Sequence, residues 1–510
     1  MLFASALFGC SKLDEDLNGE LTEEEARGLL GSSGGNTDVA SLLNSIYLGL
    51  HEPYANNNSM WALQQHTTDE TIGPTRGGDW DDGGVWRVLH SHQWDANHPY
   101  FVNIFRNLLR TSFAATDLLR FNPTPAQAAE ARFYRALTSW TVLDGWDQVP
   151  YRENTTDPSE VPKVRKGSEA LEYIITEVEE ALPNLPDNVQ EFQVSKDAAR
   201  VLLMKLYMSR GVIQDRQNPT FEQADMDRVI ALADQIISQN KYTLTPFYFN
   251  NFAPLNDALS TENIFTLANR EPAVPGTNGT NGAQFIYHQS LHYHSPVENG
   301  GGWNGFTTLS DFYNKFSADD ERRESEYPGV TDTRGLKVGF LVGQQYGPGG
   351  VELKDRKGNP LAFRPEVKLL ETDPVAIELN GIRVVKYVPD YEFQFPTRND
   401  YVIFRYADVL LLKAEALLRS NRAGEAVSLV NQVRARAGIS PLGTVNLDEL
   451  LDERGREFYW EGQRRTDLIR FGKYLQPWQE KPASDPSRLI FPIPNRALAA
   501  NPNLVQNPGY

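Results

Sequence analysis

The chain of 510 residues contains a single cysteine, Cys10, so it cannot form an internal disulfide bond. It also lacks any stretch of about 18 consecutive apolar residues, and we therefore predict no membrane-spanning helix. Basic residues are fewer than acidic ones, with 49 Lys and Arg and 67 Asp and Glu, which gives a formal net charge of −18. Such a charge disfavours binding to nucleic acid or directly to anionic lipid head groups. What is present, with 40% hydrophobic residues, is enough apolar side chain for a large folded core.

Cys10 follows a short apolar run, residues 2–8, and precedes a polar, acidic stretch, residues 11–16. This arrangement resembles the lipobox of a bacterial lipoprotein, in which the cysteine is acylated and the preceding peptide is removed. We therefore expect residues 1–9 to be a remnant of a signal peptide, Cys10 to carry lipid and residues 10–20 to form a tether. No Lys or Arg precedes the short apolar run, which indicates that Met1 is not the natural start. An ordinary signal remnant without lipidation is the alternative.

Hydrophobic residues recur at intervals of three and four along much of the chain, which is the period of an amphipathic helix. Pro125 marks the start of one such helix, because the first turn needs no N–H group at that position. The expected helical regions are 21–50, 100–240 and 401–475, with separate helices near 125–146, 168–182, 196–213, 222–240, 405–418, 422–437 and 447–462. Successive helix pairs have nearly the ~34-residue period of tetratricopeptide (TPR) units. We predict a mainly α fold built as a TPR-like stack.

Two parts of the chain interrupt this pattern. Residues 51–99 are rich in Gly, Asp, Trp and His and are predicted to be irregular. Residues 245–400 mix prolines, glycines and β-formers, with turn-rich segments at 276–282 and 299–305 and a short strand expected at 382–388. The proline-rich tail, 490–510, is expected to be extended. Because loops on a rigid scaffold often carry recognition, we predict one domain over 21–510 with a variable ligand-binding insertion at about 245–400.

Glu453, Glu457 and Glu461 stand four residues apart, which places them on one face of a helix. Paired carboxylates are typical of glycoside hydrolases, which need an acid and a second carboxylate across the scissile bond. Arginines interleave with them, at positions 454, 456, 464 and 465. Ion pairs on the helix surface, or partly buried, explain this pattern better than catalysis does. We predict no catalytic residue.

Three histidines, His288, His292 and His294, lie within seven residues. No single helix or strand aligns all three, whereas a zinc site needs three or four convergent ligands. The segment DWDDGG at 79–84 begins like a calcium-binding loop, but its twelfth position is His90 rather than Glu. The glycine-rich segments lack the Lys-Ser/Thr that follows a phosphate-binding loop. We predict no metal ion, no cofactor and no nucleic-acid partner, and leave open a calcium site of another kind.

Aromatic residues gather in the two irregular segments. A sugar ring stacks its C–H face on a flat aromatic ring, while carboxylate, amide and guanidinium groups bind its hydroxyls. A tryptophan flanked by glycine and asparagine, as Trp303 is, is poorly placed for a core position. The aromatic set comprises Trp80, Trp86 and Trp94 in the first segment, and Tyr287, Tyr293 and Trp303 in the second. The predicted glycan-binding residues are Trp80, Trp86, Trp303, Tyr293, Arg76, Asp79 and Asp81.

Several stretches of the sequence resemble the SusD/RagB family of Bacteroidota outer-membrane lipoproteins. Towards the C-terminus they are RYADVLLLKAEALLR at 405–419, AVSLVNQVRARAG at 426–438, LLDERGREFYWEGQRRTDLIRFGKY at 450–474 and FPIPNRALAANPNLVQNPGY at 491–510. In the N-terminal half they are EARFYRALTSWTVLDGWDQVPY at 130–151 and SKDAARVLLMKLYMSRG at 195–211. Their order and spacing extend the resemblance over nearly the whole chain from Cys10 onward.

The resemblance implies a SusD-like fold of about four TPR-like helix pairs beside a variable region of loops and short strands. It implies a non-catalytic lipoprotein on the cell surface of a Gram-negative member of the Bacteroidota, anchored in the outer membrane through Cys10. Such a protein binds glycan and passes it to a SusC-like TonB-dependent barrel. The glycan site is expected where the two irregular segments meet, with residues that vary between members. A peptide- or protein-binding lipoprotein of a nutrient-import complex is the alternative, and a glycoside hydrolase is a third, less favoured function.

Overall fold

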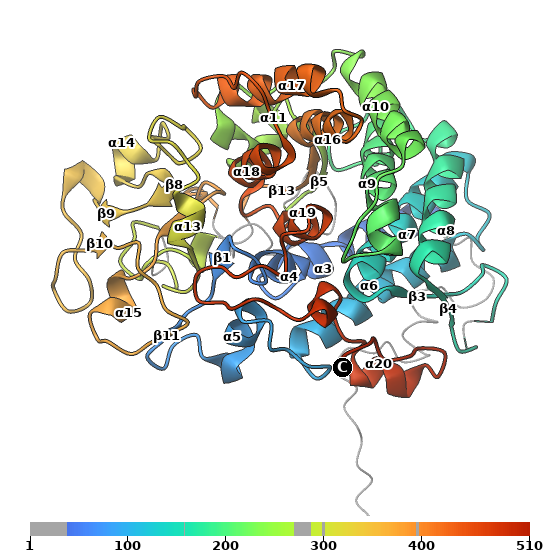
Figure 1. Ribbon diagram of the computed structural model, residues 1–510, viewed down its shortest axis with the longest axis horizontal. Helices are drawn as coiled ribbons and strands as arrows, with labels where there is room; N and C mark the ends of the chain where they lie inside the picture. The colour runs from blue at the N-terminus through green and yellow to red at the C-terminus, as the bar shows by residue number, and fades with distance from the viewer. Residues whose placement is uncertain (1–37, 158, 270–286, 298–300, 394–396) are drawn as a thin grey trace, which may run out of the picture.

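The computed structural model describes residues 38–157, 159–269, 287–297, 301–393 and 397–510. The predicted signal remnant, Cys10 and its tether therefore lie outside the described residues, as do the first part of the helix expected at 21–50 and the turn-rich segment 276–282. Figure 1 shows long helices packed side by side on one side of the molecule, with short strands and loops on the other. This is the mainly α, TPR-like arrangement that the sequence predicts.

The first part of the stack is formed by helices that follow one another in the sequence. They are α6 (Pro99–Leu118), α7 (Pro125–Trp146), α8 (Gly167–Ala181), α9 (Lys196–Gln214) and α10 (Gln223–Ile237). Each packs against the next, and α2 (Val39–Leu48) covers α6 and α7. The start of α7 is fixed by Pro125 in its first turn and by a capping box, in which Thr124 and Gln127 satisfy each other's backbone N–H groups.

The stack continues after the long insertion. Helix α10 packs directly against α16 (Tyr406–Arg419), which packs in turn against α17 (Ala423–Arg436) and α18 (Leu447–Phe458). In Figure 1 the orange helices α16 and α17 lie beside the green α10. Helix α19 (Arg464–Arg470) then returns to contact α9 and α4 (Met60–Gln65). The C-terminal helices thus extend the stack and join it to the N-terminal segment.

The long helices predicted from the sequence are confirmed, with small shifts at their ends. Residues 51–99 are less irregular than predicted, because they include α3 (His51–Tyr54), α4 and α5 (Val85–His90). The tail is not fully extended either, since α20 (Asn495–Ala500) interrupts it. These helices are no longer than about two turns, which is too short for a 3.6-residue pattern to show.

Short strands hold the insertion to the stack. β5 (Asn263–Leu267) pairs antiparallel with β13 (Tyr401–Arg405), so the two ends of the insertion are tied together. β8 (Val338–Leu341) lies between β7 (Glu324–Ser325) and β12 (Arg383–Val385), the strand predicted at 382–388. Other short elements are β3 (Gln148–Tyr151), β4 (Lys163–Lys166), β9 (Gly343–Gln344), β10 (Ala362–Phe363), α11 (Asn256–Leu259), α13 (Ser310–Tyr313), α14 (Thr331–Arg334) and α15 (Ala376–Leu379).

The three glutamates of the α18 region are buried, so the prediction of surface or partly buried ion pairs is wrong about their position. Glu453 pairs with Arg322 at 2.8 Å, and Glu457 pairs with the same arginine at 2.9 Å and with Arg405 at 2.6 Å. Arg405 also reaches Glu461 at 2.8 Å. These arginines belong to the insertion and to β13 rather than to the neighbouring sequence. The network therefore ties α18 to both.

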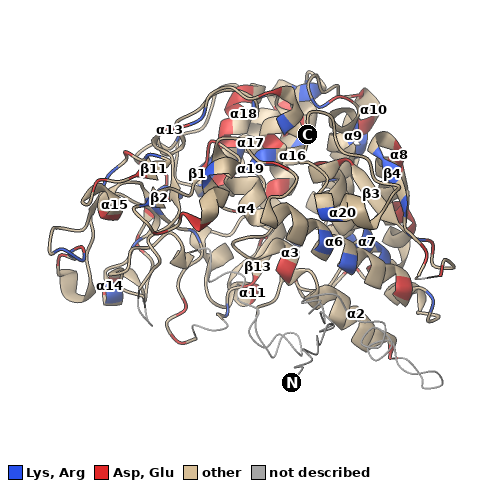
Figure 2. Cartoon of the chain, turned by 90° about the horizontal axis from the view of Figure 1, so that it is seen from below, with Lys and Arg blue, Asp and Glu red and all other residues tan. Residues whose placement is uncertain are grey.

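One hydrophobic cluster extends from Leu43 to Leu504 and includes side chains of both the stack and the insertion. Seen from below, acidic and basic residues are interspersed over the helices (Figure 2). In the described ranges, no helix is both long enough and apolar enough to cross a membrane.

Candidate functional site

Two pairs of very short strands attach the segment before α6 to the insertion. β1 (Thr71–Ile72) pairs antiparallel with β6 (Thr307–Thr308). β2 (Thr75–Arg76) pairs in parallel with β11 (Leu370–Glu371). The residues after β2 are therefore held beside residues 301–305, the described part of the glycine-rich segment 299–305. The two irregular segments of the sequence meet at this junction.

Two buried arginines fix the backbone of the junction. The Arg76 guanidinium donates to three carbonyl oxygens of the insertion at 3.0–3.2 Å, one of them that of Gly305. Arg383 donates to the side-chain oxygen of Asn304 at 2.7 Å. Burial lowers the pKa of Arg76 to about 10, at which it is still charged at neutral pH. Because Arg76 is only 2% exposed, it supports the junction from inside and offers almost no surface to a ligand.

Trp80 and Trp303 form a pair of partly exposed indole rings, which we call the aromatic platform. Their ring centroids are 6.5 Å apart and their planes are inclined by 32°. Trp80 Nε1 donates to the carbonyl oxygen of Trp303 at 2.8 Å. The Trp303 ring in turn stacks on that of His288 at 5.7 Å. Rings held in place before a ligand arrives lose little conformational freedom on binding, which favours affinity.

Gly305 allows Trp80 to lie this close to the insertion. A Cβ atom at position 305 would come within 2.4 Å of Trp80 Cε2, whereas carbon atoms in contact are ordinarily about 3.5–4.0 Å apart. Trp80 itself has a φ of +60°, a backbone conformation that is rare for an aromatic residue and is found mainly where packing or function requires it. Both features set the orientation of the indole ring.

Polar side chains border the platform. The hydroxyl of Tyr293 donates to the Asp79 carboxylate at 2.8 Å. The Arg356 guanidinium lies 4.1 Å from the centroid of the Tyr293 ring and donates to Glu378 at 2.6 Å. Burial, with the hydrogen bond to Asp79, raises the pKa of Tyr293 to about 12, so its hydroxyl stays a neutral donor. Asp81 is partly exposed. A hydroxyl, carboxylates and a guanidinium are the groups that bind sugar hydroxyls.

Trp86 lies beneath the platform rather than on it. It is 2% exposed, and its Nε1 donates to Asp82 at 2.8 Å. Its ring packs against Phe306 at 4.6 Å, and Phe306 packs against Trp80 at 4.8 Å. Phe306 is a support that the sequence reasoning missed. It directly follows the glycine-rich segment, but no pattern in the sequence distinguishes it from other core phenylalanines.

The structure therefore brings most of the predicted residues to one place. Trp80 contacts Trp303, and Tyr293 contacts Asp79. The two pairs are adjacent because Asp79, Trp80 and Asp81 follow one another in the chain. Arg76 and Trp86 belong to the interior of the same junction and have almost no surface to offer a ligand. Two further members of the aromatic set are also buried: Trp94, which donates to the Tyr510 hydroxyl at 2.7 Å, and Tyr287.

The three histidines of the insertion have separate partners. His288 and His294 each lie near a backbone carbonyl oxygen, at 3.3 and 2.7 Å, and His292 Nε2 lies 2.8 Å from the Glu378 carboxylate. Desolvation lowers the pKa of His292 to about 4 in spite of Glu378, so its ring is neutral at physiological pH. Among the described residues, no group of three or more His, Cys, Asp or Glu side chains is arranged to hold a metal ion.

The buried glutamates of α18 are unsuited to acid–base chemistry. Burial alone would raise the pKa of Glu453, but Arg322 and Arg456 outweigh it and lower this pKa to about 2. A general acid instead needs a pKa raised towards the working pH. The arrangement around the aromatic platform can stack and hydrogen-bond a ligand, whereas these carboxylates hold the fold together.

Comparison with known proteins relates the chain to one family. The family model described as SusD family matches residues 380–510. The starch-binding protein SusD of Bacteroides thetaiotaomicron is 27% identical over 422 residues, which cover 76% of this chain and 73% of that protein.

Solved structures show the same architecture. A SusD superfamily protein from Parabacteroides distasonis has a TM-score of 0.72 to this chain at 19% identity, covering 96% of this chain and 100% of that one. Surface glycan-binding protein A from Bacteroides thetaiotaomicron, in complex with laminarihexaose, has a TM-score of 0.63 at 21% identity, covering 92% and 98%. At these identities the likeness shows the fold.

Proposed function

The chain belongs to the SusD/RagB family, and we propose that it is a non-catalytic protein that binds glycan at the cell surface. In this proposal the aromatic platform captures an oligosaccharide, with Tyr293, Asp79 and Asp81 binding its hydroxyls.

The aromatic platform is the observation that carries the proposal. Its two indole rings are partly exposed at a polar junction, with a centroid separation of 6.5 Å. The apolar face of a sugar can stack on such rings, while the paired Tyr293 hydroxyl and Asp79 carboxylate accept and donate hydrogen bonds at its edge. Two related proteins, one named for starch binding and one solved with laminarihexaose, support a glycan as the ligand.

Binding without hydrolysis is the second part of the proposal. The sequence features that suggested a hydrolase, Glu453 and Glu457, are buried and engaged by arginines. A glycosidase needs two carboxylates on either side of a bound sugar, one of them protonated. The related proteins are likewise named for binding.

Delivery is the third part. We propose that lipid on Cys10 anchors the protein in the outer membrane and that a SusC-like TonB-dependent barrel receives the oligosaccharide. Two or more acyl chains suffice for stable anchoring, at about 0.8 kcal/mol per buried methylene. These steps rest on family membership and on the lipobox-like sequence around Cys10.

Calorimetric titration with oligosaccharides of different linkage tests the binding function, with laminarihexaose and a maltooligosaccharide as the first ligands. Trp80→Ala and Trp303→Ala should each weaken binding by about tenfold or more, because each removes one stacking surface near the centre of the site. Trp478→Ala is the matched control. Trp478 is also a partly exposed tryptophan, but it packs against His92 and Tyr474, so its loss should leave affinity unchanged.

Three results would count against the proposal. Unchanged affinity in both platform variants would contradict the site, and no affinity of the folded protein for any glycan would contradict the function. Binding of peptides without any response to glycans would favour the peptide-import alternative. Release of reducing ends from a polysaccharide would establish a hydrolase.

A further inference from the structure

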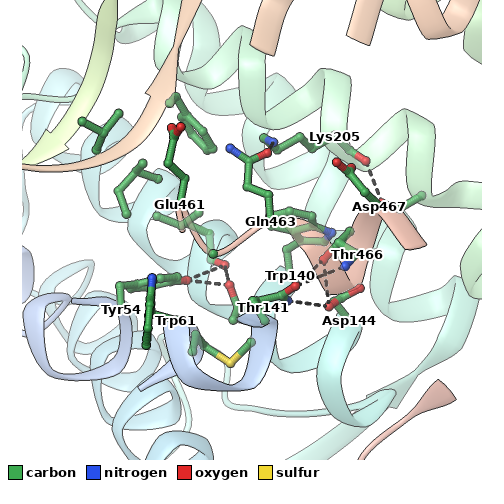
Figure 3. Close-up of a pocket in the computed structure, with 18 of the residues that line it drawn as sticks. Tyr54, Trp61, Trp140, Thr141, Asp144, Lys205, Glu461, Gln463, Thr466 and Asp467 are labelled. Carbon is green, nitrogen blue, oxygen red and sulfur yellow. Dashed lines mark hydrogen bonds between the residues drawn. The ribbon is translucent and has the colours of Figure 1, made fainter. Parts of the chain in front are cut away.

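A cavity of about 100 Å³ lies inside the helical stack, where α4, α7 and α9 meet β13 and α19. Its lining includes Trp61, Trp140 and Gln463 and shares no residue with the aromatic platform (Figure 3). A cavity of about 150 Å³ is needed to hold a six-carbon ring, so this space is too small for a sugar ring with its hydroxyls. It adds no second sugar site, and the buried charged groups beside the platform bear on binding more directly.

Glu378 is a buried carboxylate to which the function proposed above gives no role. It lies on α15 and is only 1% exposed. Its oxygens accept hydrogen bonds from His292 at 2.8 Å and from the Arg356 guanidinium at 2.6 Å. His292 directly precedes Tyr293 in the chain, and the Arg356 guanidinium covers the Tyr293 ring, 4.1 Å from its centroid. Glu378 therefore contacts two separate neighbours of Tyr293.

The tautomer of His292 is assigned by its two hydrogen bonds. The backbone N–H of His294 donates to Nδ1 of His292 at 3.0 Å, so this nitrogen accepts and the ring proton lies on Nε2. The Nε2–H group then donates to the Glu378 carboxylate at 2.8 Å. The neutral ring therefore links α15 to the residues on both sides of Tyr293 and holds the backbone between them.

Arg356 is held both by its side chain and by its backbone. Its Nε donates to one oxygen of Glu378, and its backbone N–H donates to the other at 3.2 Å. Burial would raise the pKa of Glu378, but hydrogen bonds from His292 and Arg356 outweigh it and lower this pKa, so the carboxylate is charged at neutral pH. Charge-assisted hydrogen bonds of this kind are about twice as strong as neutral ones. The guanidinium therefore keeps its place over the Tyr293 ring, whose hydroxyl lies 2.8 Å from Asp79.

The same short helix fixes the other half of the site. The Ile377 carbonyl oxygen accepts a hydrogen bond from the Asn304 side chain at 2.9 Å. Asn304 directly follows Trp303 of the platform. Helix α15 therefore holds Trp303 through its backbone and Tyr293 through the side chain of Glu378.

We infer that Glu378 is a positioning residue of the glycan site. Through His292 and Arg356 it holds the Tyr293 hydroxyl in the orientation in which a sugar hydroxyl meets it, and it touches no ligand itself. A group that is fixed before binding loses little conformational freedom, which favours affinity. This role rests on the function proposed above, in which Tyr293 binds a sugar hydroxyl.

Glu378→Gln is the sharpest variant, because an amide cannot satisfy both partners. With its oxygen towards His292, its N–H groups face the Nε–H of Arg356; turned over, they face the Nε2–H of His292. Moving the ring proton to Nδ1 would set it against the backbone N–H of His294. In calorimetric titration with laminarihexaose and a maltooligosaccharide, affinity should fall about fivefold. Arg356→Met, which removes the guanidinium, should have an effect of similar size.

Tyr293→Phe separates positioning from a general structural role. It keeps the ring but removes the hydroxyl, so adding Glu378→Gln to it should cause no further loss of affinity. An equal loss from Glu378→Gln in both backgrounds would overturn the inference, and so would wild-type affinity of Glu378→Gln and Arg356→Met. Glu130→Gln is the matched control: this glutamate accepts from the Tyr134 hydroxyl at 2.7 Å within α7, away from the site, and its loss should leave affinity unchanged.

Crystal structures without ligand give a second test. In Glu378→Gln and Arg356→Met, the Tyr293 hydroxyl should lie more than about 3.5 Å from Asp79, beyond hydrogen-bond distance. An unchanged distance of 2.8 Å in both variants would overturn the inference. If Glu378→Gln does not fold, Arg356→Met gives the decision, because the Arg356 side chain is 42% exposed and its loss leaves the core intact. A wild-type protein that binds no glycan would refute the function proposed above, while the distance to Asp79 would still decide the role of Glu378.

Discussion

Replacing Gly305 by alanine should weaken glycan binding while both tryptophans of the aromatic platform remain. The added Cβ atom would lie 2.4 Å from Cε2 and 2.5 Å from Cζ2 of Trp80, and 2.9 Å from the carbonyl oxygen of Gln289. That carbonyl is held by hydrogen bonds from the backbone N–H groups of residues 305 and 306. The partly exposed indole of Trp80 is therefore the group that moves.

The geometry sets the size of the effect. Restoring a carbon–carbon contact of about 3.5 Å requires a shift of the indole by about 1 Å, which breaks its 2.8 Å hydrogen bond to Trp303. Overpacking of this kind costs ~1–3 kcal/mol of stability. If the displaced ring no longer covers roughly 50 Å² of a sugar face, the binding free energy weakens by ~1.3 kcal/mol at about 25 cal/mol per Å². The expected rise in Kd is about tenfold.

Calorimetric titration of Gly305→Ala against the best oligosaccharide ligand measures this change, with thermal melts to follow stability. Gly78→Ala is the matched control. Gly78 lies two residues before Trp80 in the same loop, its φ is outside the left-handed region, and a Cβ there would meet nothing within 4 Å. The control should keep wild-type affinity and stability. Equal affinity of the two variants would refute the argument that close contact with Gly305 sets the binding orientation of Trp80.

Three further predictions concern the scaffold. Arg405→Met should lower the free energy of unfolding by about 3–5 kcal/mol, because Glu457 would keep a buried charge without its 2.6 Å partner. Chemical denaturation measures this change. A decrease in the free energy of unfolding of less than about 1 kcal/mol would contradict a stabilising role for the network. Burial raises the pKa of Glu70 from 4.5 to about 8, so between these pH values the folded chain keeps a proton that the unfolded chain releases, and stability should fall as the pH rises from 4.5 to 8. Thermal melts at about pH 6 and about pH 9 should therefore show a smaller decrease in melting temperature for Glu70→Gln than for the wild type. An equal decrease in both proteins would argue against this role of Glu70. Gly211→Ala should destabilise the protein by about 2 kcal/mol or more, because the added Cβ would lie 1.8 Å from the Thr220 carbonyl oxygen. Gly424→Ala, on α17 where a Cβ meets nothing, should instead stabilise it by up to about 1 kcal/mol. Circular-dichroism melts test the pair, and melting temperatures that shift in the same direction in both variants would contradict the prediction.

The long helices were predictable because each buries one face over several turns. In α6, the buried positions Phe101, Ile104, Phe105 and Leu108 repeat at intervals of three and four, and this period is visible in the sequence. The pairing of α10 with α16 was not visible in this way, because the residues of the insertion separate them and no local pattern reports a contact between distant segments. The resemblance to a family implied a stack of about four helix pairs, but it did not say which helices pack together across the insertion.

The glutamates of α18 show the limit of reasoning from one helix. Their spacing of four residues correctly indicates a shared face, and the neighbouring arginines correctly indicate charge pairing. The sequence around them, however, does not contain Arg322 or Arg405, the partners that Glu457 uses in the interior. Without those partners a local interpretation assigns such charges to the surface, since an unpaired carboxylate in a core would cost several kcal/mol.

The candidate site shows the same limit at the level of single side chains. Trp80 and Trp86 both lie in a segment rich in glycine and aspartate, and their local sequences predict the same role. Both rings pack against Phe306, but Trp86 also packs against His66 at 4.9 Å and Tyr100 at 5.0 Å. The missing Cβ of Gly305, in the insertion, instead lets one edge of Trp80 rest on the backbone while the ring remains partly exposed. Exposure of an aromatic ring is thus decided by a remote segment, so composition can locate a binding junction of this type but cannot say which of its rings faces the ligand.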